Sequence, residues 1–146
     1  MKIWIQNLQK HTPLDLRRIR REVRRILAEL AVPDAELGIL FVGDAQIQGL
    51  NRRYLRRDKP TNVIAFPMQE GEFSGLHPGL LGDLVVSVET AKRQSRGFGL
   101  SERGMITLLL THGILHLLGY EHEKSKKKAR EMALKQRALL HKVLRK

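Results

Sequence analysis

The spacing of apolar residues changes several times along this 146-residue chain, and each change predicts a different element. Alternation near the start predicts a strand from Lys2 to Gln9. Apolar residues then recur at helical spacing from Leu16 to Leu30, which predicts a helix that runs to about Ala31. The pair Thr12-Pro13 is typical of a helix start, with threonine as the N-cap and proline in the first turn.

The middle of the chain reads as strands joined by a short helix and one long loop. Three strands are predicted, at Leu37–Val42, Asn62–Phe66 and Leu84–Val88. The first is apolar on both alternating faces, which indicates a buried strand. Asp44 is expected to cap a helix that ends near Tyr54. The loop from Pro67 to Gly82 is rich in glycine, and loops this long are usually functional or disordered.

The last third of the chain reads as helices, predicted at Glu89–Arg96, Glu102–Leu118 and Ser125–Leu144. The middle helix is apolar nearly all round, so it is expected to be buried. Ser101 is its expected N-cap, and Gly119 ends it. This order of elements predicts an α+β fold: one domain over residues 1–146, with a mixed four-stranded sheet packed with about five helices.

Charge and composition narrow the class of protein. The chain has 27 Lys and Arg against 15 Asp and Glu, a net charge of +12, which favours a polyanionic partner such as nucleic acid or a ribonucleoprotein. The alternative is a solvated surface that happens to be basic. The lack of cysteine excludes disulfides and thiolate metal sites. No secretory signal or membrane span is evident, so we expect a soluble cytoplasmic protein.

Candidate chemistry is concentrated in THGILHLLGYEHEK, residues 111–124, which contains H-x3-H-x5-H. His112 and His116 are four apart on the predicted buried helix, so their rings lie on one side of it. Gly119 then turns the chain, which allows His122 to fold back to the same point. Three nitrogen ligands with an open fourth position are typical of a catalytic zinc site. Histidines that only hydrogen-bond within a core are the alternative, and the spacing favours the metal.

The same spacing matches the metzincin peptidase signature H-E-x-x-H-x-x-G-x-x-H, with one decisive departure. Gly113 stands where the peptidase has the glutamate that serves as its general base. The sequence therefore predicts a metal site without peptidase activity.

Three segments, in the same order, resemble motifs of the YbeY family of ribosomal-RNA maturation endoribonucleases. HGILHLLGYEH is similar to H-G-x-L-H-L-x-G-Y-D-H, LNRRYLRRDKPTNVIAFP to L-N-x-x-Y-R-x-K-D-x-P-T-[DN]-V-L-S-F-P, and LGDLVVS to L-G-D-I-V-I-S. The close resemblance spans about Leu50 to Glu123. It implies one zinc ion, held at the bottom of a cleft by His112, His116 and His122. It also implies single-strand-specific RNA cleavage in ribosome maturation and quality control, including the 3′ end of 16S ribosomal RNA, with the small ribosomal subunit as partner.

The chain departs from these motifs at Leu55, Arg57, Ala65 and Glu121, where the family has arginine, lysine, serine and aspartate. Arg56 is the candidate catalytic replacement for the missing arginine, and a plain surface role is its alternative. Glu121 either orients a ligand histidine from behind or is a solvated turn residue. The candidate RNA-binding residues are Arg57, Lys126, Lys127 and Lys128.

The sequence leaves the nucleophile open. The site has no obvious second carboxylate, so a water activated by the metal and the RNA 2′-hydroxyl are both possible nucleophiles. Two other functions remain as alternatives: a metallohydrolase with another substrate, and a ribosome-assembly factor with little catalysis.

Overall fold

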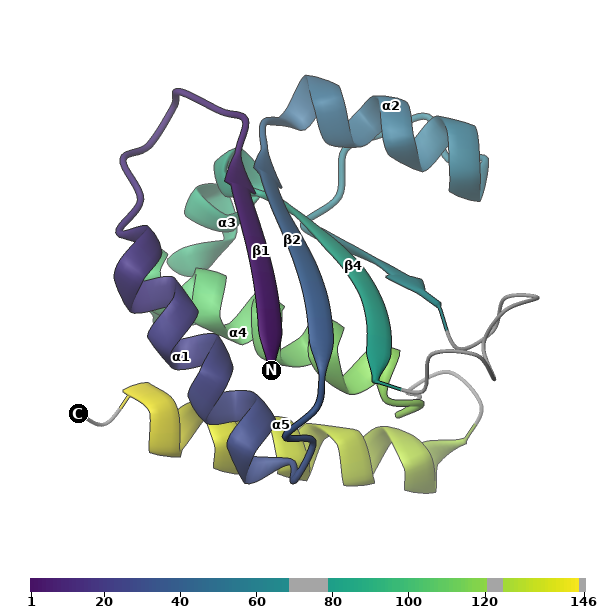
Figure 1. Ribbon diagram of the computed structural model, residues 1–146. Helices are drawn as coiled ribbons and strands as arrows, with labels where there is room; N and C mark the ends of the chain where they lie inside the picture. The colour runs from purple at the N-terminus through teal and green to yellow at the C-terminus, as the bar shows by residue number, and fades with distance from the viewer. Residues whose placement is uncertain (69–78, 121–124, 145–146) are drawn as a thin grey trace.

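The computed structural model describes residues 1–68, 79–120 and 125–144. In this part of the chain four strands and five helices follow one another in the predicted order (Figure 1). They are β1 (Lys2–Asn7), α1 (Leu16–Glu29), β2 (Glu36–Val42), α2 (Asp44–Leu55), β3 (Val63–Pro67), β4 (Leu80–Ser87), α3 (Val88–Ser95), α4 (Glu102–Leu117) and α5 (Lys126–Leu144). Within these ranges, no helix is both long and apolar enough to cross a membrane.

The four strands form one mixed sheet in the order β1-β2-β4-β3, which confirms the predicted α+β class. β1, β2 and β4 are parallel, and β3 is an antiparallel edge strand beside β4. β4 begins at Leu80, four residues earlier than predicted, because its first residues pair on both sides. Gly82 lies opposite Leu37 on β2 and Pro67 on β3, so a residue expected to be in a loop belongs to the sheet.

The helices cover the two faces of the sheet unequally. One face carries Leu37, Ile39, Phe41 and Leu84, which pack with α1, α4 and α5 in the main core. In Figure 1, α4 runs behind the strands and α5 runs below them. The other face meets α2, and Ile47 of this helix packs in a smaller apolar cluster with sheet residues such as Val85. The apolar stripes that sequence periodicity identified are thus buried on both sides of one sheet.

The predicted start of α1 is wrong by three residues. The N-cap is Asp15, whose side chain accepts a hydrogen bond from the backbone N–H of Arg18, 3.1 Å away. Thr12 does not cap the helix, because the Gln9 side chain hydrogen-bonds the Thr12 backbone. The Gln9 amide oxygen accepts from the Thr12 N–H at 3.0 Å, and the amide nitrogen donates to the Thr12 carbonyl at 2.8 Å. A glutamine earlier in the chain therefore delays the helix.

Asp44 is also not the cap that the sequence predicted. Gly43 occupies the cap position of α2, and Asp44 is the first helical residue. Its carboxylate accepts hydrogen bonds from the hydroxyls of Ser87 and Thr90, at 2.7 and 2.6 Å, and from the Arg93 guanidinium at 2.7 Å. Burial alone raises the pKa of this carboxyl, but the three hydrogen bonds outweigh burial and lower the pKa below its ordinary value. Asp44 thus ties α2 to α3 across the end of the sheet.

Candidate metal centre

The histidine-bearing helix α4 is held in the main core, as its apolar sequence predicted. Ser101 caps it by accepting a hydrogen bond from the Gly104 N–H at 3.0 Å. Gly113 faces β4 so closely that a Cβ built on it would lie 2.6 Å from a methyl carbon of the buried Leu84. The position of the peptidase glutamate therefore points into the sheet, and glycine there serves close packing of helix and strand.

A buried ion-pair cluster, which the sequence analysis missed, fixes α4 against α1. Glu22 is only 5% exposed although it is charged. Its carboxylate accepts a hydrogen bond from the Thr107 hydroxyl at 2.6 Å and lies 3.2 Å from the Arg103 guanidinium. A buried charge needs such partners, so this contact sets how α4 lies against α1. The signal available in the sequence was a glutamate on an apolar helical stripe.

His112 and His116 come together as predicted. Their Nε2 atoms lie 3.1 Å apart, and their rings meet edge to face with centroids 4.6 Å apart. Both residues are half-buried, at the rim of the core rather than within it. Two imidazoles bound to one tetrahedral zinc ion, each at about 2.0–2.1 Å, would place their nitrogens roughly 3.3 Å apart. The pair therefore fits a zinc ion, and one shared proton would also join the two nitrogens by a hydrogen bond.

The other ring nitrogen of His112 has a partner on a different helix. Nδ1 lies 2.8 Å from the side-chain oxygen Oε1 of Gln136, which is on α5. Metal-binding histidines characteristically use their second nitrogen in this way, to donate to an oxygen that fixes the ring. Sequence reasoning did not find Gln136, because it lies 24 positions away from His112.

The remaining two predicted residues of this site, His122 and Glu121, lie outside the described residues. Among the residues described, no three His, Asp or Glu side chains gather closely enough to hold a metal. The described part of the chain thus provides two convergent histidines and the geometry at the end of their helix. Gly119 has a φ of +96°, a left-handed conformation that suits glycine and turns the chain after α4.

The two arginines that follow α2, Arg56 and Arg57, have different surroundings. Arg56 is the C-cap residue of α2, exposed, with a positive φ of 58°. Arg57 lines a hollow of about 470 Å³ between α2, β3 and α3, together with Leu55, Lys59 and Arg93. Leu55, which replaces the family arginine, therefore shares this hollow with Arg57, and Arg56 is not among its lining residues.

The candidate RNA-binding lysines form the first turn of α5. Lys126, Lys127 and Lys128 are all exposed. They precede Gln136 by eight to ten residues, which is about 12–15 Å along a helix axis. Gln136 contacts His112, so α5 carries both the lysines and a residue of the histidine site. The lysines lie at the start of this helix, and Gln136 lies near its middle.

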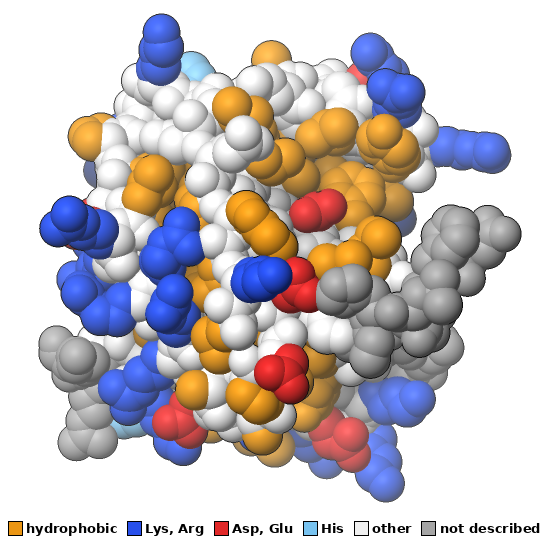
Figure 2. All heavy atoms as spheres, viewed as in Figure 1, with side chains coloured by type: hydrophobic (Ala, Val, Ile, Leu, Met, Phe, Trp, Pro, Cys, Tyr) orange, Lys and Arg blue, Asp and Glu red, His pale blue; other side chains and the backbone are white. Residues whose placement is uncertain are grey.

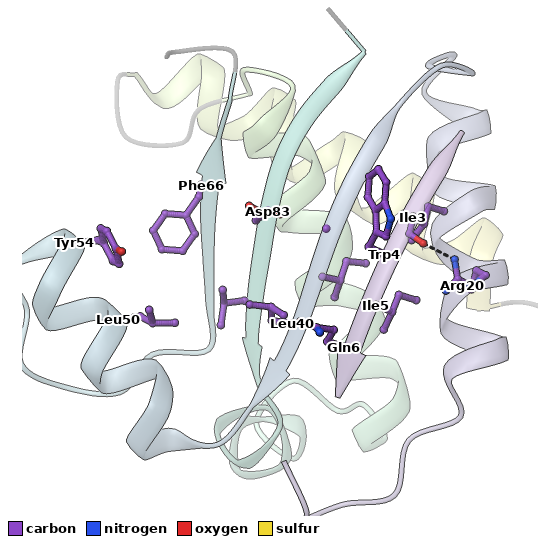
Figure 3. A pocket seen from close by; sticks show the side chains of 13 residues that line it. Ile3, Trp4, Ile5, Gln6, Arg20, Leu40, Leu50, Tyr54, Phe66 and Asp83 are labelled. Atoms are coloured by element: carbon purple, nitrogen blue, oxygen red, sulfur yellow. Dashed lines mark hydrogen bonds between the residues drawn. The ribbon is translucent and has the colours of Figure 1, made fainter. Parts of the chain in front are cut away.

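A groove of about 850 Å³ crosses the other face of the sheet, beside α2 (Figure 3). Trp4, Gly38, Asp83 and Phe66 form one row across its four strands. Tyr54 of α2 meets the Phe66 ring edge to face, with centroids 5.5 Å apart. Figure 2 shows hydrophobic side chains gathered beneath α2, with most Lys and Arg side chains elsewhere on this face. Sequence analysis did not identify this groove.

Comparison with known proteins places the chain in a family. The family model described as "Endoribonuclease YbeY" matches residues 4–144. A protein of that name from Syntrophotalea carbinolica is 47% identical over 142 residues, which cover 97% of this chain and 95% of the relative. One from Geobacter metallireducens is 45% identical over 140 residues, 95% of this chain and 93% of the relative.

A solved structure agrees with these matches. The solution structure of TM1509 from Thermotoga maritima aligns with a TM-score of 0.69 and 27% identity. The alignment covers 97% of this chain and 88% of that one. The match extends over nearly the whole fold, including the sheet and the helix that carries the paired histidines. The chain belongs to the YbeY family.

Proposed function

We propose that this protein is a zinc-dependent, single-strand-specific endoribonuclease that acts in ribosomal RNA maturation and ribosome quality control, including the 3′ end of 16S ribosomal RNA. The observation that carries the proposal is the convergence of His112 and His116 Nε2, 3.1 Å apart, in a chain whose relatives are named as endoribonucleases. The net charge of +12 suits an RNA substrate.

The proposed metal ligands are His112, His116 and His122. A zinc ion held by these residues would act as a Lewis acid toward the scissile phosphate. The chain's own residues set the geometry: the Glu22 contact fixes α4 against α1, and the four-residue spacing brings the two Nε2 atoms to one point. Glu121 is proposed to orient a ligand histidine.

The proposed RNA contacts come from two places, the first turn of α5 and the residues that follow α2. Lys126, Lys127 and Lys128 guide the RNA backbone toward the histidines from the start of α5. Arg57 offers a cation in the hollow where Leu55 has removed one. Arg56 is proposed as a catalytic replacement for the family arginine. RNA cleavage is measured for Arg56→Ala and Arg57→Ala, with Arg53→Ala as control. Only substitution of an arginine that faces the phosphate should slow cleavage markedly.

The test of the function is single-turnover cleavage of a ribosomal RNA precursor by the zinc-loaded protein, with a His116→Ala variant prepared in parallel. We expect cleavage that the variant and a chelator both abolish. Equal cleavage by both proteins would point to a contaminating nuclease. Tight RNA binding by the zinc-loaded protein without cleavage would favour the assembly-factor alternative, and metal-dependent hydrolysis of a non-RNA ester alone would favour another metallohydrolase.

A further inference from the structure

The side chain of Gln136 interrupts the buried stripe of α5. Met132, Leu139 and Val143 are the buried residues of this helix, each at most 3% exposed. Gln136 stands four residues after the first and three before the second, so it lies on the same side of the helix. Packing alone would favour an apolar residue here, since a buried or half-buried amide needs hydrogen-bond partners.

The partner that this amide meets is the candidate ligand His112. The Gln136 Oε1 atom lies 2.8 Å from His112 Nδ1, within normal hydrogen-bond range. The contact joins α5 to α4, and the Nε2 atom of the same ring faces His116 Nε2 at 3.1 Å. One imidazole thus connects the amide on one side to the proposed metal position on the other.

We propose that Gln136 is a positioning residue of the metal centre, which keeps the proton of His112 on Nδ1 so that Nε2 presents its lone pair to the metal. This inference rests on the proposed zinc site. A neutral imidazole carries one N–H and one lone pair. An amide oxygen only accepts hydrogen bonds, so it selects the ring form with the proton on Nδ1. The hydrogen bond also fixes the rotation of the ring toward His116.

The amide achieves this without adding charge to the site. A carboxylate at the same position would accept a hydrogen bond from the same Nδ1–H and would make the ring a stronger ligand. A methionine of similar length would fill the space and offer no strong acceptor. Glutamate and methionine at position 136 therefore separate the hydrogen bond from the packing, because the two variants differ mainly in accepting power.

The experiment compares Gln136→Met, Gln136→Glu and Arg137→Met with the unaltered protein. Arg137 is the exposed next residue of α5 and serves as the control for a methionine in this helix. Zinc affinity is measured by competition with a chromogenic chelator, and ligand geometry by the visible spectrum of the cobalt-loaded protein. We expect Gln136→Met to weaken zinc binding by about 10–100-fold. Gln136→Glu retains zinc affinity equal to or above that of the unaltered protein, and Arg137→Met is without effect.

A second readout needs no metal. Nitrogen-15 shifts of the metal-free protein report which ring nitrogen of His112 carries the proton. We expect Nδ1 in the unaltered protein and in Gln136→Glu, and loss of that preference in Gln136→Met. A proton on Nε2 in the unaltered protein would overturn the inference, as would equal zinc affinity in Gln136→Met and the unaltered protein.

The outcomes also separate this inference from the zinc site itself. If Gln136→Met and Gln136→Glu lose affinity to the same extent, the residue matters only for helix packing and the inference fails. If the unaltered protein binds no zinc or cobalt, the proposed function fails, while the nitrogen-15 measurement still decides whether Gln136 selects the form of His112.

Discussion

The two faces of the sheet differ in what covers them and in what chemistry they carry. The face against α4 is closed: Ile39, Phe41 and Leu84 are at most 1% exposed. The face beside α2 is partly open, and Trp4 and Tyr54 are 54% and 55% exposed. Described residues of the open face line a hollow of about 850 Å³, whereas the paired histidines lie on α4, which covers the closed face. Depth and apolar lining alone therefore do not point to the paired histidines.

The convergence of side chains on one point is more informative than the depth of a hollow. The histidines of α4 have defined partners, Gln136 behind and each other in front. In the groove, Asp83 lies across Gly38, where a Cβ would be 2.1 Å from its Oδ1 atom. That arrangement keeps the floor of the groove low, but it does not bring two or more ligand atoms to one point. Because one face is closed and the other is partly open, we expect substitutions on the two faces to change the free energy of unfolding by different amounts.

The largest difference is expected between Leu84→Ala and Trp4→Ala. Leu84 is fully buried between the sheet and α4, so truncation should cost about 2–5 kcal/mol of unfolding free energy. Trp4 already has half of its surface in water, so its truncation should cost less than half as much. Urea unfolding of both variants measures this. Equal losses would show that the open face is covered in solution.

A second pair of variants makes the same substitution on helices of the two faces. In Gly113→Ala, the new methyl group meets buried Leu84, so we expect a net loss of up to about 2 kcal/mol after the gain in helix propensity. In Gly49→Ala on α2, a Cβ meets nothing within 4 Å, and we expect a gain of about 0.5–1 kcal/mol. A gain in both variants would mean that α4 has room to spare.

Gly113→Glu tests the peptidase comparison, because it restores the glutamate of the peptidase signature. Position 113, however, faces β4. Glutamate there would enter the core rather than the histidine site. We therefore expect Gly113→Glu to unfold the protein more easily and to confer no peptidase activity, as a casein-cleavage assay beside thermal unfolding would show.

Much of the fold was predictable because it depends on local patterns. The helical period around Ile19, Val23 and Ile26 and the buried α4 segment gave the correct order of elements, and all three of those α1 residues are at most 1% exposed. The spacing of His112 and His116 gave their convergence, since four residues make about one helical turn. These inferences needed only the geometry of a single element.

Most features that sequence reasoning missed depend on contacts between distant segments. The start of α1 is a local exception, because the Gln9 side chain, three residues before Thr12, hydrogen-bonds the Thr12 backbone. Asp44 was assigned to its own helix, whereas its partners come from residues 87, 90 and 93. Gln136 reaches His112 only because α5 folds back along α4. Side-chain pairs that join separate elements have no periodic signal in a single sequence.

RNA binding offers a third test of the two faces. Each phosphate contact to a single strand contributes about 0.7 to the slope of log affinity against log salt. Replacing Lys126, Lys127 and Lys128 with glutamine should therefore flatten the slope by up to about 2, if α5 guides RNA to the histidines. The charge control replaces Arg52 and Arg53 on α2, beside the groove. A larger change in the control would move the RNA path to the open face.

A further small effect concerns the Asp44 carboxylate, which links α2 to α3. Asp44 on α2 bonds Thr90 and Arg93 on α3, and these bonds outweigh burial to lower its pKa below the ordinary 3.8. Because the folded pKa lies below the unfolded one, ionised Asp44 contributes stability above about pH 4, and the contribution is lost as pH falls through the folded pKa. At pH 7 we expect Asp44→Asn to cost about 1 kcal/mol, since asparagine still accepts from the hydroxyls.

Urea unfolding at several values between pH 7 and pH 3 measures the difference between the unaltered protein and Asp44→Asn. That difference should stay constant down to about pH 5 and narrow below about pH 4, where the carboxylate of the unaltered protein takes up a proton. The exposed Asp34, changed to asparagine in the same way, controls for the loss of one carboxylate. A constant difference at all pH values would mean that the link between α2 and α3 depends on the shape of the side chain rather than on its charge.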